Sequence, residues 1–249
     1  MLITMNEMTN KKVLLTGGTA GIGRAIALQL VKEGYDAVII GRSADKMDDV
    51  LSDNRHDNPR GTLEGILLDL TDEAAVEETL KAYFESHGCP DVLINNAALA
   101  YNSVLEEKEV TLDYLLKTNL WAYMYLAGKV GERMIEEGIE GDIINIGSLS
   151  ADTREKDSSA YVATKAGIQG FTESFRKEVN PHNIRVSLIE PGAVGSDMQP
   201  TSPEEERELQ AKHEMLKAED IADAVLFVLQ QPRRSNIVEL RIKPLRQFI

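Results

Sequence analysis

The residues best suited to chemistry in this chain are a tyrosine and a lysine four positions apart, with a serine upstream. Tyr161 and Lys165 would share one helix face if the tyrosine opens a helix, and Ser148 precedes the tyrosine by thirteen residues. A tyrosine hydroxyl has an ordinary pKa of about 10, and a nearby ammonium lowers it. A serine hydroxyl could hold a substrate oxygen. The three residues predict a proton-transfer site that needs a separate electron carrier.

A strand, a glycine turn and a helix near the N-terminus could bind that carrier. Residues 11–16 form a short apolar run, and residues 24–33 have helical composition. The turn between them has the spacing G-x-x-x-G-x-G through Gly17, Gly21 and Gly23. This spacing differs from G-x-G-x-x-G, but it meets the same needs of a tight turn and a close backbone approach to a phosphate. The alternative is a glycine-rich turn without function, and the flanking elements favour nucleotide binding.

The end of the second predicted strand indicates which nucleotide is bound. Residues 36–40 are apolar, and Arg42 follows nineteen residues after Gly23, where a dinucleotide-binding fold reads the adenosine ribose. An acidic residue there would favour NAD, whereas a guanidinium suits the 2′-phosphate of NADP. Ser43 could add a hydroxyl donor. We therefore expect NADP (NADPH) rather than NAD, the alternative being a solvated arginine at a strand end.

Polar residues follow the third and fourth predicted strands as well. Asp69, at the end of the third strand, could bond the adenine amino group or cap local backbone. Asn95 and Asn96 follow residues 91–94 at the strand end that faces the ligand crevice of open α/β sheets. We expect a structural role for Asn95 and a cofactor-side role for Asn96 and Ala97.

The second half of the chain continues the alternation of strands and helices. Residues 141–147 form a strand that ends at Ser148, and residues 184–189 form one that ends in a Pro-Gly turn. The alternation predicts an α/β protein with one doubly wound parallel sheet in a single domain. A long helix is expected over residues 109–137, with Asn119 in its middle, where asparagine is unfavourable. The acidic stretch 197–217 is interpreted as a mobile lid or as a solvated connection.

Composition and charge exclude several classes of function. The chain has 27 basic against 41 acidic residues and a net charge of -14, which argues against nucleic-acid partners and anionic membranes. No apolar run reaches the roughly 18 residues of a membrane span. The single cysteine, Cys89, cannot form an internal disulfide, and the first ten residues lack an apolar signal segment. We expect a cytoplasmic protein without a metal site.

The order of these motifs resembles that of the classical short-chain dehydrogenases/reductases over essentially the whole chain. Thr16 to Gly23 matches TGxxxGxG, Asn95 to Ala97 matches NNA, and Tyr161 to Lys165 matches YxxxK. Pro191-Gly192 matches the late PG motif, and Ser148 has the family's spacing. Two departures are Ala98, in place of the usual glycine of NNAG, and Ser196, which replaces the commoner threonine and keeps its hydroxyl.

The resemblance implies a Rossmann fold over residues 1–249, with a cofactor half at about 11–147 and a catalytic and substrate half at about 148–249. It implies a catalytic tetrad of Asn119, Ser148, Tyr161 and Lys165, in which Asn119 supports a water relay to Lys165. It also implies a homodimer or homotetramer built on helices 109–137 and 158–179. The expected cofactor-binding residues are Gly17, Thr19, Gly21, Ile22, Gly23, Arg42, Ser43, Asp69, Leu70, Asn96, Ala97, Tyr161, Lys165, Pro191, Gly192, Val194 and Ser196.

The expected activity is hydride transfer between nicotinamide and a small carbonyl or alcohol substrate, with Tyr161 as the general acid or base. The run Ile-Asn-Ile-Gly-Ser, the Gly-Arg pair and the Ile-Glu-Pro-Gly turn look closest to enzymes acting on 3-hydroxy acids and hydroxy amino acids such as serine. Alternatives are a non-catalytic NADP(H)-binding redox sensor, and an enzyme of the same fold acting on sugar or acyl-carrier substrates. The complete tetrad argues against a sensor, and the acidic charge argues against a protein carrier.

Overall fold

One seven-stranded parallel sheet runs through the protein. The computed structural model describes residues 10–56, 59–101, 103–105, 110–196 and 201–247. The strand order is β3-β2-β1-β4-β5-β6-β7, and all neighbouring pairs are parallel. This confirms the doubly wound sheet predicted from the alternation. The strands are β1 (Lys12–Thr16), β2 (Asp36–Gly41), β3 (Leu63–Leu67), β4 (Val92–Asn95), β5 (Asp142–Ile146), β6 (Arg185–Pro191) and β7 (Glu239–Ile242).

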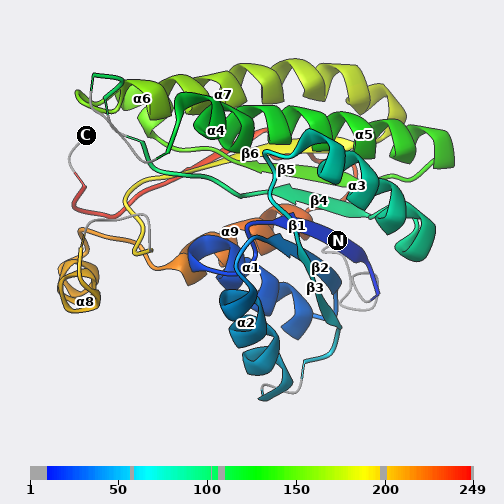
Figure 1. The fold of residues 1–249 in the computed structure, drawn as a ribbon, viewed down its shortest axis with the longest axis horizontal. Helices are drawn as coiled ribbons and strands as arrows, with labels where there is room; N and C mark the ends of the chain where they lie inside the picture. Colours follow the sequence, from blue (N-terminus) through cyan, green and yellow to red (C-terminus); the bar gives the residue numbers. More distant parts are fainter. Residues whose placement is uncertain (1–9, 57–58, 102, 106–109, 197–200, 248–249) are drawn as a thin grey trace.

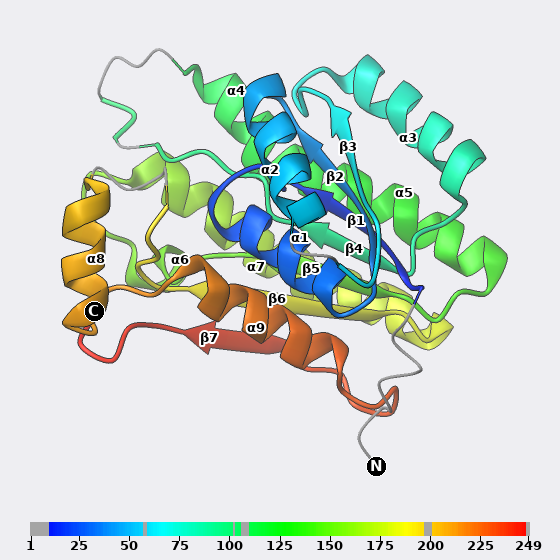
Figure 2. The ribbon, with the colours of Figure 1, turned by 90° about the horizontal axis from the view of Figure 1, so that it is seen from below.

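Helices cover both faces of the sheet. In Figure 1, α3, α4, α5 and α7 lie on one side of it, and α1, α2 and α9 lie on the other. Figure 2 looks onto the second group and shows α8 set apart from it at one end. The α-helices are α1 (Gly21–Lys32), α2 (Ala44–His56), α3 (Glu73–His87), α4 (Leu112–Leu116), α5 (Ala122–Glu137), α6 (Ser150–Thr153), α7 (Ser159–Val179), α8 (Pro203–Ala211) and α9 (Ala218–Leu229).

The two-sided cover explains why the central strands are apolar throughout. In β1, Val13 and Leu15 pack into the cluster formed with α1 and α9. Leu14, between them, packs into the cluster on the opposite face, which includes side chains of α3 and α5. Successive side chains of a strand point to opposite faces, so a strand covered on both sides needs an unbroken apolar run.

The direction in which the chain adds strands to the sheet reverses at β1: β2 and β3 extend the sheet on one side of it, and β4 to β7 on the other. Strand β1 pairs with β2 along one edge and with β4 along the other. In open α/β sheets, a crevice for ligands forms at such a reversal, outside the carboxyl ends of the strands. The residues singled out after strands therefore gather at one end of the sheet.

The predicted helix 109–137 contains a change in helical geometry at Asn119. α4 passes into a short π-helical segment at Lys117–Trp121, which continues into α5. Glu109, the predicted start, lies outside the described residues. A π-turn inside an α-helix changes the local hydrogen-bond pattern and often marks a functional site. Asn119, the asparagine in the middle of the long predicted helix, lies inside this segment.

The stretch predicted as a lid contains one helix, α8, and part of it lies outside the described residues. Ser202 and Glu205 cap α8 reciprocally. Beyond the helix, Met215 is buried and Leu216 pairs with Val194. Within the ranges that the structure describes, no helix combines the length and the apolarity needed to cross a membrane.

Candidate active site

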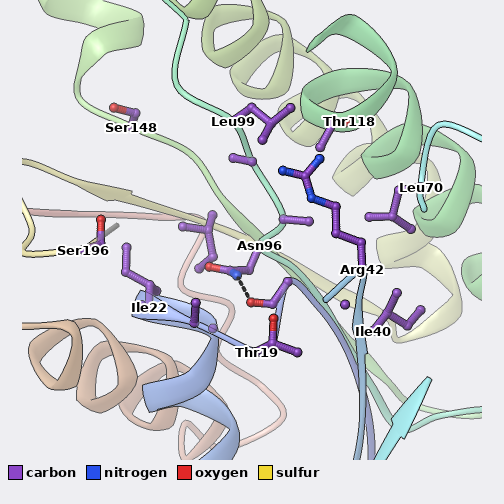
Figure 3. A pocket seen from close by; sticks show the side chains of 18 of the residues that line it. Thr19, Ile22, Ile40, Arg42, Leu70, Asn96, Leu99, Thr118, Ser148 and Ser196 are labelled. Atoms are coloured by element: carbon purple, nitrogen blue, oxygen red, sulfur yellow. Dashed lines mark hydrogen bonds between the residues drawn. The ribbon is translucent and has the colours of Figure 1, made fainter. Parts of the chain in front are cut away.

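A pocket of about 490 Å³ lies at the carboxyl ends of the central strands. Figure 3 shows Ser148 and Ser196 towards one end of it, and Arg42 and Leu70 towards the other. All of the predicted cofactor residues line this pocket, as do three members of the predicted tetrad, Ser148, Tyr161 and Lys165. Asn119, the fourth member, is buried behind the pocket.

The glycine turn approaches the end of β4 too closely for side chains. Gly17 has a φ of +68°, and a Cβ there would lie 2.8 Å from the Cα of Ala97. A Cβ at Gly23 would overlap the carbonyl oxygen of Gly17. The Asn96 side-chain amide donates to the carbonyls of Thr16 and Gly17, each at 3.1 Å. Asn96 therefore ties β4 to the turn, and because it also lines the pocket, its role towards the cofactor stays a prediction.

The turn fits the phosphates of a dinucleotide. α1 begins at Gly21, and no side chain caps its first turn. Backbone N–H groups at such a helix start carry partial positive charge and suit an anion. The close glycine packing holds these groups at the pocket wall, so the residues present fit a nucleotide cofactor.

Ser148, Tyr161 and Lys165 meet at the other end of the pocket. Ser148 follows β5, whereas Tyr161 and Lys165 lie one turn apart on α7. The Lys165 ammonium donates to the carbonyl of Ile146 at 2.9 Å and lies 5.7 Å from the centre of the Tyr161 ring. The Ser148 hydroxyl lies close enough to Tyr161 to lower the pKa of the tyrosine by hydrogen bonding. The predicted spacing therefore brings these three residues together.

The pKa of Tyr161 lies above its ordinary value, which contradicts the lowering expected from the neighbouring lysine. Burial raises this pKa, and the hydrogen bond from Ser148 only partly offsets the effect. Lys165 is 2% exposed, and burial lowers the pKa of its ammonium to about 7. An ammonium whose own pKa is lowered by burial, and which is bonded to a backbone carbonyl, does less to favour the phenolate. The Tyr161 hydroxyl is therefore protonated at neutral pH.

A buried carboxylate, Glu190, lies beneath this end of the pocket. It stands at the end of β6, is fully buried, and accepts a hydrogen bond from Gln169 of α7 at 3.0 Å. Its second oxygen lies 3.2 Å from the guanidinium of Arg241. Burial raises the pKa of Glu190 to about 7, against the lowering by Gln169 and Arg241. Its negative charge raises the pKa of Lys165 and so opposes the effect of burial on the ammonium.

The Asn119 side chain holds the loop that follows β4. Its oxygen accepts from the backbone N–H of Leu99 at 2.8 Å, and its amide donates to the Leu99 carbonyl at 2.9 Å. The same amide lies 3.4 Å from the hydroxyl of Thr164, the residue before Lys165. Asn119 thus connects the loop that carries Ala97 and Leu99 to the helix that carries Tyr161.

The loop after β6 closes the pocket near Ser148. Leu149 N–H donates to the carbonyl of Pro191 at 3.0 Å. Ser196 N–H donates to the carboxylate of Glu206 in α8 at 3.1 Å, and Ala193 N–H donates to the side chain of Gln247 at 3.0 Å. The Pro-Gly turn is therefore held by three separate segments of the chain.

The opposite end of the pocket contains residues that the sequence reasoning missed. Tyr114 and Thr118, one turn apart at the start of the π-containing helix, line the pocket together with Arg42 and Asp69. Asp69 accepts from the backbone and the hydroxyl of Thr71, at 2.9 and 2.8 Å, which is the local capping considered as an alternative. The spacing of Tyr114 and Thr118 could have indicated a shared face, but nothing local points them towards Arg42.

Comparison with known proteins agrees with this architecture. The family model described as short chain dehydrogenase matches residues 11–207. An uncharacterized oxidoreductase of Staphylococcus aureus is 31% identical over 241 residues, which cover 96% of this chain and 100% of the relative. A similar oxidoreductase of Staphylococcus saprophyticus is also 31% identical, with the same coverage.

Two solved structures are similar over almost the whole chain. A metagenomic short-chain oxidoreductase in complex with NADP is 29% identical, with a TM-score of 0.80 and coverage of 95% of this chain and 98% of that one. An alcohol dehydrogenase from the archaeon Thermococcus sibiricus, complexed with 5-hydroxy-NADP, is 25% identical, with a TM-score of 0.83 and coverage of 96% and 98%.

The sheet topology defines a protein with a Rossmann-like fold, and the pocket lies at the carboxyl ends of its central strands. More narrowly, the chain belongs to the short-chain dehydrogenase/reductase family, as the family model and the relatives show.

Proposed function

We propose that this protein is an NADP(H)-dependent oxidoreductase that interconverts a small carbonyl compound and its alcohol. One observation carries the proposal: a single pocket is lined by a glycine turn at a helix start, an arginine at the ribose-reading position, and the Ser148, Tyr161 and Lys165 group. Nicotinamide, when bound, supplies or accepts the hydride. The residues of the chain bind the cofactor, orient the substrate and move the proton.

In this proposal, Tyr161 transfers the proton of the reacting oxygen. Its raised pKa keeps the hydroxyl protonated near neutral pH, which suits donation to a carbonyl oxygen during reduction. Ser148 holds the same oxygen where negative charge develops. Lys165 supports the proton transfer and holds the ribose hydroxyls of the cofactor.

Asn119 and Glu190 act on these residues from behind the pocket. Both ends of the Asn119 amide are bonded to Leu99, so in this proposal the side chain fixes the loop after β4. The water relay to Lys165 stays a prediction. The charge of Glu190 favours the ammonium form of Lys165.

The assignment is tested with a panel of small 3-hydroxy acids, hydroxy amino acids, simple alcohols, sugars and their carbonyl counterparts. Absorbance of NADPH and NADH is followed in both directions. We expect turnover with members of the carbonyl–alcohol panel, among which the 3-hydroxy acid and hydroxy amino acid group is the proposed class. Tight binding of NADPH without turnover of any panel member would favour a redox-sensing role.

Cofactor preference gives a direct prediction. Replacing Arg42 with alanine should raise the dissociation constant of NADPH about ten- to a hundredfold, because charged hydrogen bonds to the 2′-phosphate are lost. The constant for NADH should barely change. Fluorescence titration measures both constants, and Arg60→Ala, at an exposed arginine outside the pocket, is the control. Equal weakening of both cofactors would rule out a role for Arg42 at the 2′-phosphate.

We also propose that the chain forms a homodimer or homotetramer through the helices that carry Asn119 and Tyr161. The supporting observation is an exposed apolar stripe along α4 and α5, formed by Leu112, Leu116 and Met124, which are 43%, 40% and 45% exposed. Leu112 and Leu116 are four residues apart and share one face of α4, and Met124 is exposed further along, on α5.

Replacing Met124 with glutamate should shift the assembly towards monomer, because burying an unpaired carboxylate costs several kcal/mol. Light scattering coupled to size-exclusion chromatography measures the mass. Lys129→Glu adds a negative charge to an exposed position of the same helix and should leave the mass unchanged. An unaltered oligomer in Met124→Glu would place the interface elsewhere.

A further inference from the structure

Three side chains from separate elements form a hydrogen-bonded series across the pocket end opposite Tyr161. Arg42 follows β2, Asp69 follows β3, and Tyr114 lies in α4. The guanidinium of Arg42 donates to the Tyr114 hydroxyl at 2.7 Å. That hydroxyl donates in turn to the carboxylate of Asp69 at 2.8 Å. All three residues line the pocket, and Figure 3 shows Arg42 reaching across it towards Thr118.

The Tyr114 hydroxyl is held in place by an anchored acceptor. The other oxygen of Asp69 is bonded to the backbone and hydroxyl of Thr71. These bonds, the bond from Tyr114 and the charge of Arg42 outweigh burial and keep the pKa of Asp69 below its ordinary value. An ionised carboxylate polarises the phenol that donates to it, which makes the phenol oxygen a better acceptor for the guanidinium. The series therefore fixes the direction of an otherwise exposed arginine side chain.

The Tyr114 ring adds a second contact to Arg42. The centre of the guanidinium lies 5.7 Å from the ring centre, within the range of a cation–π interaction. A tyrosine at this position can therefore both pack against Arg42 and hydrogen-bond to it, whereas phenylalanine could only pack. This difference allows the hydroxyl to be tested separately from the ring.

The Tyr114 hydroxyl also lies between Arg42 and Asp69, the acidic residue of the series. Arg42 and Asp69, which are both described, are connected through the neutral hydroxyl and form no direct ion pair. A guanidinium has five N–H donors in a planar fork, and only one bond in this series uses them. A direct ion pair with Asp69 would take two of these donors and neutralise the charge that a phosphate needs. The bridge leaves the arginine available for an anionic ligand.

We infer that Tyr114 is a positioning residue for cofactor selectivity: its hydroxyl holds Arg42 in place for the 2′-phosphate of NADP(H) and keeps Arg42 from pairing with Asp69. This inference rests on the proposed function. Tyr114 itself has no assigned contact with the nicotinamide, the substrate or the reacting atoms. Its effect should therefore appear in the adenosine half of the cofactor alone.

The test uses Tyr114→Phe in the full-length protein and isolated adenosine nucleotides as probes. Calorimetric titration measures the binding of 2′,5′-ADP, which carries the 2′-phosphate, and of 5′-ADP, which lacks it. We expect affinity for 2′,5′-ADP to fall about tenfold, and affinity for 5′-ADP to change by less than about twofold. NADPH and NADH should show the same contrast.

A second variant tests the separation from Asp69. If loss of the hydroxyl lets Arg42 pair with Asp69, the double variant Tyr114→Phe/Asp69→Asn should recover most of the affinity for 2′,5′-ADP. Recovery would support the inference, and a double variant as weak as the single one would contradict it. Tyr125→Phe serves as a matched control, because that ring stacks on Trp121 and lies outside the pocket.

The outcomes separate this inference from the proposed function. A wild-type protein that binds 2′,5′-ADP and 5′-ADP equally well would overturn the NADP preference and the inference with it. If the wild type prefers 2′,5′-ADP over 5′-ADP and the Tyr114→Phe variant keeps the same preference, the inference alone would be overturned. If Tyr114→Phe lost affinity for both nucleotides equally, Tyr114 would have a merely structural role, and the inference would also be overturned.

Discussion

Replacing Tyr161 with phenylalanine should lower turnover about a thousandfold while leaving NADPH binding nearly intact. A positioned general acid or base contributes about 10²–10⁴-fold to a rate, and the substitution removes only the hydroxyl of a side chain held between Ser148 and Lys165. The Lys165 ammonium keeps its bond to the Ile146 carbonyl, so the wall of the pocket should persist. Steady-state kinetics and fluorescence titration of NADPH measure the two effects separately.

Tyr125→Phe is the matched control for this experiment. Its ring stacks on Trp121 with ring centres 4.8 Å apart and lies outside the pocket, so turnover should stay at the wild-type level. A Tyr161→Phe protein that kept full turnover with every active substrate would remove Tyr161 from the mechanism.

The protonation of Tyr161 also determines how the rates of carbonyl reduction and alcohol oxidation change with pH. Carbonyl reduction needs the protonated hydroxyl, so its rate should be level at neutral pH and fall at alkaline pH. Alcohol oxidation needs the phenolate and should rise over the same range. Because the hydrogen bond from Ser148 lowers this pKa, Ser148→Ala should move both midpoints to higher pH. Profiles of kcat/KM against pH, taken in both directions, give these midpoints.

The second large effect is expected from Gly23→Ala. An alanine Cβ would overlap the carbonyl oxygen of Gly17 and come within 2.5 Å of the Asn96 amide. The turn would have to open, which displaces the helix start that faces the phosphates. NADPH affinity should fall at least about a hundredfold, or about 2.7 kcal/mol, and overpacking should cost about 1–3 kcal/mol of folding stability. Calorimetric titration and urea unfolding measure these changes.

Gly170→Ala provides the control for adding a methyl group to a glycine. Gly170 lies in α7 with open space where its Cβ would stand. Alanine is the better helix former by about 0.8–1 kcal/mol, so this variant should be slightly more stable and bind NADPH as the wild type does. If Gly23→Ala also bound NADPH normally, the glycine turn would not be the phosphate site.

Much of this architecture could be predicted because the signals are local. The apolar runs at Val13–Leu15 and in the later strands require cover on both faces, and this implies the parallel sheet. Tyr161 and Lys165 share a helix face through their spacing alone. Ser148 and the glycine turn stand directly after strands, and the carboxyl ends of parallel strands meet at one edge of the sheet.

Other features depend on contacts that no local pattern records. The lysine beside Tyr161 suggested a lowered pKa, but burial, which raises it, depends on how α7 packs against the sheet. Tyr114 contacts Arg42 across 72 positions of sequence, and its type and spacing are those of an ordinary amphipathic helix. The unfavourable Asn119 was a visible signal, but the π-turn in which it lies could not be specified from sequence.

The position of β1 in the sheet has a consequence for how the chain folds. Its first edge pairs with β2, which follows soon after it, while its second edge pairs with β4, so that Val13 lies beside Val92. A growing polypeptide would expose that second edge until β4 has been synthesised. Pairing segments so distant in sequence costs more loop-closure entropy than pairing strands that follow one another closely. Docking of β4 onto β1 should therefore limit the folding rate. Cold-sensitive or aggregating variants should cluster along the contact between these two strands, and the cofactor pocket opens at the carboxyl end of the same contact.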